Sequence, residues 1–137
     1  MNMLEKSMLF VPNRFFADGH EMYVSFNIAG IPRDMSVTAM TIMIPLPEHT
    51  SGMLHLHEIT QGWDEQLIQT ARPAHSLSMS AIPTPADLQE GSCVLTHLAY
   101  SWRFRSLENH GVHIILESPG AAPFTVSHMP YILIRTL

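Results

Sequence analysis

The feature that most constrains the fold is an alternation of side chains with a period of two. Between residues 22 and 28, the apolar side chains of Met22, Val24, Phe26 and Ile28 occupy every second position. Successive side chains of a strand point to opposite faces, so this segment predicts a strand with one apolar face. Apolar segments bounded by proline and glycine predict further strands at residues 36–44, 53–59, 75–81, 92–95, 112–117, 124–128 and 131–136.

One segment follows a helical period instead. Four apolar residues between 95 and 102, including Trp102, recur at the spacing of one helix face. Thr96 is a suitable N-cap, and residues 109–111 supply a stop that ends in Gly111. We therefore expect one short helix that packs Trp102 inward.

About eight short strands and one helix predict an all-β fold, an antiparallel β-sandwich of the jelly-roll type. The chain has 137 residues, which suits one domain with one core. We expect a single domain over residues 1–137, in which residues 1–21 form a short N-terminal segment ahead of the main body at 22–137.

Charge and composition exclude several classes of function. The net charge is −5, with seven Lys and Arg in all, so we expect no nucleic-acid partner. No segment has the roughly 20 apolar residues that a membrane span needs, so we expect no membrane insertion. The first residues lack the apolar run of a signal peptide. The expected location is a spore or cell surface reached by a non-classical route, or otherwise the cytoplasm.

Four sequence blocks follow one another in a fixed order. They are YVSFNIAGIP at residues 23–32, ITQGWDE at 59–65, LTHLAYSW at 95–102 and PYILI at 130–134. In this order they resemble the motifs of the DNRLRE domain family, as a trimmed and divergent member in which Asn27 stands where the family usually has aspartate. The resemblance implies a β-sandwich that serves as a non-catalytic module of bacterial and archaeal surface proteins. Some relatives of that family bind polysaccharide.

Two groups of residues are candidates for ligand binding. Trp63, Asp64 and Glu65 can form an aromatic platform for a sugar, with two carboxylates as hydrogen-bond partners. Alternatively, Trp63 packs over a sheet edge and the acids cap the following turn. His55 and His57 lie on one face of the same predicted strand, about 7 Å apart, which is a spacing that metal sites use. A site would need a third ligand, and we interpret the pair as surface residues.

No arrangement of residues in the sequence indicates catalysis. Asp64 and Glu65 are adjacent and would point to opposite faces of a strand, and Cys93 has no neighbouring histidine. We therefore expect a protein that is not an enzyme and needs no cofactor. A metal-dependent enzyme on a cupin-like scaffold is a remote alternative.

The apolar N-terminal segment suggests assembly. Met8, Leu9, Phe10 and Val11 lie ahead of the first predicted strand. In the family that the sequence resembles, this region supplies early strands of the sandwich, and by that comparison it is shortened here. An open sheet edge pairs readily with another chain. We expect a structural module of a bacterial surface structure that associates with itself or with other surface-layer proteins. The alternative is a module that binds polysaccharide, and a further possibility is that this segment docks as an edge strand of its own domain.

Overall fold

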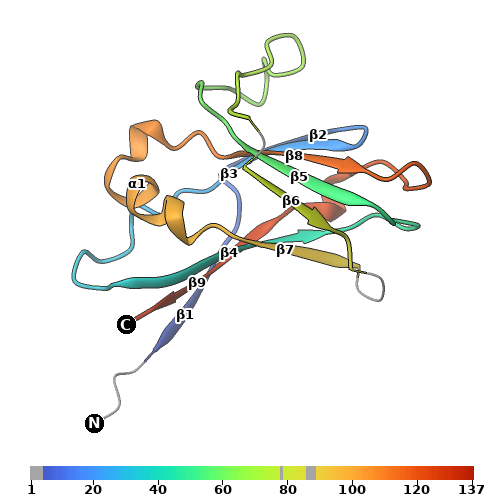
Figure 1. Ribbon diagram of the computed structural model, residues 1–137. Coiled ribbons are helices and arrows are strands. Elements are labelled where there is room, and N and C mark those ends of the chain that lie inside the picture. Colours follow the sequence, from blue (N-terminus) through green and yellow to red (C-terminus); the bar gives the residue numbers. More distant parts are fainter. Residues whose placement is uncertain (1–4, 78, 86–88) are drawn as a thin grey trace.

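The computed structural model describes residues 5–77, 79–85 and 89–137. It contains two antiparallel sheets that face each other as two layers (Figure 1). Sheet A has the order β1-β9-β4-β7, formed by β1 (Lys6–Phe10), β9 (Tyr131–Thr136), β4 (Val37–Pro45) and β7 (Glu90–Val94). Sheet B has the order β2-β3-β8-β5-β6, formed by β2 (Arg14–Asp18), β3 (Glu21–Ser25), β8 (Val112–Glu117), β5 (Met53–Glu58) and β6 (Ser80–Pro83).

This topology confirms the predicted sandwich of the jelly-roll type. Sheets A and B share one core, and β2, the edge strand next to β3, also packs Phe15 and Ala17 against it. Between the layers lies one core of side chains from both sheets, among them Met22, Ile42, Leu54 and Ile114. No helix in the described part of the chain is long and apolar enough to span a membrane.

The predicted helix forms, but it begins differently. A 3-10 turn at Thr96–Leu98 precedes α1 (Ala99–Phe104), and a second 3-10 turn follows at Ser106–Glu108. Thr96 caps neither element, because its hydroxyl accepts a hydrogen bond from the backbone N–H of Met40 on β4. Trp102 is 2% exposed and packs in the same core as Phe26, so its inward orientation is confirmed.

Several predicted strands differ in the structure. The strand expected at residues 22–28 is β3, which ends at Ser25. Residues 124–128 form a 3-10 turn at Val126–His128 because Thr125 accepts a hydrogen bond from Ser127 N–H and His128 accepts one from Thr125 N–H, which closes the turn locally. In the segment 75–81, of which residue 78 lies outside the described residues, the strand β6 begins at Ser80, and His75 forms an isolated bridge with Ile59. The segment 1–21 contains two strands: β1, which was the alternative expected for the apolar N-terminal residues, and β2, which was not expected.

Candidate functional site

Trp63 anchors the long connection between β5 and β6 against the outer face of sheet B. The indole is 9% exposed and packs with Tyr23, Ile59 and Ile68 in a second small core. Its Nε1 donates a hydrogen bond of 2.7 Å to the carbonyl oxygen of His110. A buried indole of this kind holds the loop in position and does not present an open aromatic platform.

The two acidic residues that follow Trp63 are exposed. Asp64 Oδ1 accepts a hydrogen bond of 2.6 Å from Gln66 N–H, and its carbonyl oxygen accepts one of 2.9 Å from Ile68 N–H. Asp64 therefore caps the turn after Trp63, as the alternative interpretation expected. The structure still brings Trp63, Asp64 and Glu65 together along one cavity of about 400 Å³, which Arg14 and Gln66 complete; we call it the tryptophan pocket.

Arg14, at the start of β2, joins this pocket to a neighbouring one. Its guanidinium lies 4.8 Å from the centre of the Trp63 ring, and Nη1 donates a hydrogen bond of 2.7 Å to the carbonyl oxygen of Trp63. Its Nε donates a bond of 2.9 Å to Ser25 Oγ. Burial lowers the pKa of Arg14, and the carboxylates of Glu65 and Asp64 oppose this shift. Arg14 is thus a fixed cation with acids on one side.

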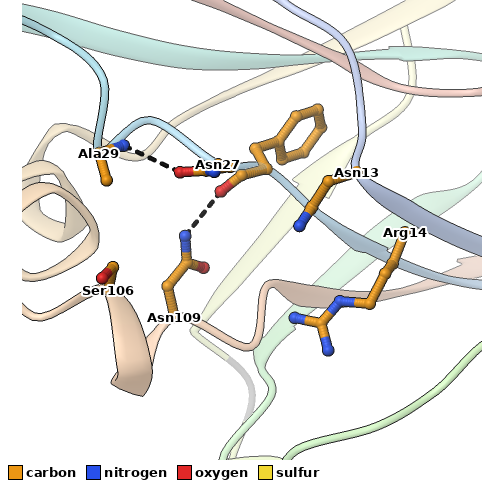
Figure 2. A pocket seen from close by; sticks show the side chains of 7 residues that line it. Asn13, Arg14, Asn27, Ala29, Ser106 and Asn109 are labelled. Atoms are coloured by element: carbon orange, nitrogen blue, oxygen red, sulfur yellow. Dashed lines mark hydrogen bonds between the residues drawn. The ribbon is translucent and has the colours of Figure 1, made fainter.

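The second cavity, the asparagine pocket, has a volume of about 270 Å³ (Figure 2). Asn13 and Arg14 face Ser106 and Asn109 across it, and Asn27 lies along its upper side in that view. Asn109 Nδ2 donates a hydrogen bond of 2.6 Å to the Phe26 carbonyl, which fixes this side of the pocket. Its lining residues are Asn13, Arg14, Phe26, Asn27, Ala29, Ser106 and Asn109.

Sequence reasoning missed the asparagine pocket as a site. Its polar side chains come from the start of β2, the connection after β3 and the turn after α1, which are far apart in the sequence. The local signal was weak, since asparagine and serine near strand ends also form ordinary turns. The asparagine pocket offers amide donors, and the tryptophan pocket offers carboxylate acceptors. The guanidinium of Arg14 lies between them and lines both. Such a surface suits a ligand that is rich in hydroxyl groups.

The structure separates the two histidines that were candidate metal ligands. His55 Nε2 lies 2.7 Å from Glu117 Oε2, whereas His57 Nδ1 lies 3.0 Å from the carbonyl oxygen of Ser76. Among the described residues, no group of three His, Cys, Asp or Glu side chains is arranged to hold a metal ion.

His57 instead belongs to a cluster of three histidine rings on the outer face of sheet B. Strand pairing sets His113 between His57 and Tyr23, and His75 packs against both histidines. The His113 ring stacks on Tyr23 with 4.4 Å between the ring centres. His113 is 3% exposed, and neither ring nitrogen has a hydrogen-bond partner. Burial, with His75, His57 and Arg72 nearby, lowers the pKa of His113 to about 4.

The four N-terminal residues expected in assembly lie on both sides of sheet A. Met8 and Phe10 are partly buried and pack on the core. Leu9 and Val11 are exposed. Residues 6–10 therefore dock as an edge strand of their own domain. Among its side chains, those on the face away from the core, such as Leu9, are available for contact with another molecule.

The outward side chains of sheet A form a surface that we call the sheet-A face. Strand pairing aligns Leu9, Leu133, Thr41 and Val94 in one row across all four strands. Leu9 is 59%, Leu133 38% and Val94 65% exposed. The face consists of Ser7, Leu9, Ala39, Thr41, Met43, Pro45, Glu90, Ser92, Val94, Tyr131, Leu133 and Arg135.

Comparison with known proteins gives no family for this chain. No protein-family model matches it, and no curated protein matches it in sequence. Its function must therefore be argued from its own residues.

Proposed function

We propose that the chain is a non-catalytic structural module that associates with itself through the sheet-A face. The observation that carries this proposal is the exposure of Leu9, Leu133 and Val94, which lie with Thr41 in one row of the face. Contiguous apolar surface on a folded protein usually marks a contact with another molecule. The resemblance of the sequence to a family of surface modules is compatible with a role in a bacterial surface layer or appendage.

The edge of sheet A supports the same role. β1 pairs with β9 on one side, and no strand in the described part of the chain pairs with it on the other. Unpaired N–H and C=O groups at such an edge are available to a neighbouring chain. The edge therefore offers a second contact for self-association, beside the apolar row.

The opposite surface of the sandwich differs in this respect. The connection between β5 and β6 covers the outer face of sheet B through Trp63 and Ile68, which pack on Tyr23. Sheet B therefore buries its own outward aromatic residue within the chain, whereas sheet A has Leu9 and Val94 in contact with solvent.

Sedimentation velocity tests the proposal. Leu9→Lys and Leu133→Lys add charge to the row without removing a core side chain, and we expect each to convert the associated wild-type protein to a folded monomer. Leu107→Lys is the matched control, because Leu107 is 92% exposed on the turn after α1, outside the sheet-A face. A wild-type protein that stays monomeric at high concentration would refute self-association.

The joined pockets favour a second candidate function, the binding of a polysaccharide. Arg14 lines both pockets, so a chain of sugar rings laid across it would meet Asn27 on one side and Glu65 on the other. Hydroxyl groups both donate and accept hydrogen bonds, which suits this mixed lining.

Calorimetric titration against a panel of soluble polysaccharides tests this candidate. Asn27→Ala and Glu65→Ala should each weaken binding about tenfold, the effect of losing about 1.4 kcal/mol of binding free energy. Gln69→Ala, an exposed change in the same loop but outside the pocket lining, should have no effect. Binding that survives both pocket substitutions, or no binding to any polysaccharide, would count against this function.

A further inference from the structure

We propose that two copies of the chain pack their sheet-A faces across a two-fold axis beside Leu133, so that Arg135 of each copy pairs with Glu90 of the other. This inference rests on the proposed self-association and specifies its geometry. It follows from the charges on the face, from their spacing along β9, and from one hydrogen bond.

Two opposite charges lie on an otherwise uncharged surface. Among the outward positions of the described strands of sheet A, Glu90 and Arg135 carry charge, and the others are apolar or bear hydroxyl groups. Arg135 is exposed, and its side chain forms no ion pair with another described residue. Its pairing partners Ser7 and Ala39 are uncharged. The face therefore has an unpaired cation at one end.

The carboxylate of Glu90 lies near the other end of β9, beside Tyr131. Glu90 belongs to β7, and β4 separates β7 from β9 in the sheet. The hydroxyl of Tyr131 nevertheless donates a hydrogen bond of 2.8 Å to Glu90 Oε2, which brings the carboxylate across β4 to the first residue of β9. This contact also raises the pKa of Tyr131, which keeps its hydroxyl protonated as a donor.

The two ends are equally distant from Leu133. Tyr131 and Arg135 are each two residues from Leu133, or about 7 Å along an antiparallel strand. A two-fold axis that runs across the strands at Leu133 exchanges these ends. It brings Arg135 of one copy over the Tyr131–Glu90 pair of the other, and the reverse contact forms at the same time.

Such a contact is self-complementary, as a two-fold interface requires. The apolar row of each copy would lie against that of the other, with Leu133 near the axis. Facing sheets pack about 10 Å apart, a gap that an extended arginine side chain crosses. A partner with a uniformly acidic or basic surface would match only one end of this face, whereas a second copy matches both. The second copy is therefore the occupant that fits.

Charge exchange provides the test. In Arg135→Glu the introduced carboxylate would face Glu90 of the other copy, and in Glu90→Lys the introduced ammonium group would face Arg135. We expect each single variant to raise the dissociation constant of the dimer about tenfold or more, because like charges would face each other. Arg105→Glu and Glu108→Lys, which make the same charge changes on exposed residues near α1, should leave it unchanged.

Mixing the two single variants separates this geometry from a general effect of net charge on association. An equimolar mixture of Arg135→Glu and Glu90→Lys should form a mixed dimer with about wild-type affinity, and the double variant should also recover. Fluorescence transfer between separately labelled variants measures both results. If the wild-type protein associates but the charge variants bind as tightly as it does, or the mixture does not recover, the two-fold arrangement is wrong while the proposed function stands. If the wild-type protein does not associate, both are wrong.

Discussion

His113 is a buried titratable residue whose neutral form the fold requires. Its ring is 3% exposed and stacks on Tyr23, and its neighbours include His57, His75 and Arg72, which add positive charge when protonated. Glu21 Oε1 lies 3.7 Å from Nε2, and Glu21 also pairs with Arg72, which in turn binds Asp18. Protonation of His113 would therefore place a charge in a buried cluster whose nearby acid, Glu21, already pairs with Arg72.

This arrangement predicts a loss of stability in mild acid. The folded pKa of His113 is about 4, below the ordinary value of 6.5, so the unfolded chain binds this proton first as the pH falls. The stabilisation is complete above pH 6.5 and is lost between about 6.5 and 4. A shift of this size corresponds to roughly 3 kcal/mol. Urea unfolding at several pH values should show this decrease in the free energy of unfolding.

Two variants identify the residue responsible. His113→Phe keeps a ring for stacking on Tyr23 and should flatten the decrease between pH 6.5 and 4. His97→Gln removes an exposed histidine on the turn before α1 and should leave it intact. An unchanged pH profile in His113→Phe would contradict the assignment.

Among the strands, the bounds were predicted best for two that lie inside the sheets. Residues 112–117 and 131–136 were predicted as strands with the bounds that β8 and β9 have. Both strands lie inside their sheets and have partners on two sides. Their apolar positions are fixed by burial, and burial is what the period-two pattern reports.

Edge strands were harder to predict, because their pairing is set elsewhere in the chain. β1 and β2 are short, and each pairs on one side, with β9 and β3 respectively. Lys6 and Asp18 at their outer ends weaken the alternation. The extended state of these segments depends on partners that lie up to the whole chain length away, and a local pattern does not contain this information.

Prediction of the candidate site was limited in the same way, because some of its residues come together only through contacts between distant parts of the chain. Trp63, Asp64 and Glu65 are consecutive, so the sequence alone identified them as a group. Asn13, Asn27 and Asn109 meet only after β2, β3 and the turn after α1 have been packed together. Likewise, His113 joins His57 because β8 pairs with β5 in one particular register.

In the whole molecule, the two outer surfaces of the sandwich differ in how far the chain itself covers their outward side chains. The connection that carries Trp63 covers the part of sheet B around Tyr23, and the candidate polysaccharide pockets lie beside that connection. The sheet-A face exposes its apolar row to solvent. A module built in this way can associate through one surface and leave the pockets open on the other.

Hydrogen–deuterium exchange of the wild-type protein, compared between dilute and concentrated solution, tests whether copies associate through the sheet-A face. If copies meet on the sheet-A face, amides in the row through Leu9, Leu133 and Val94 should exchange more slowly as concentration rises. Amides in β2 and β6, at the edges of sheet B, should show no such dependence. Exchange that is the same at both concentrations throughout sheet A would contradict the account.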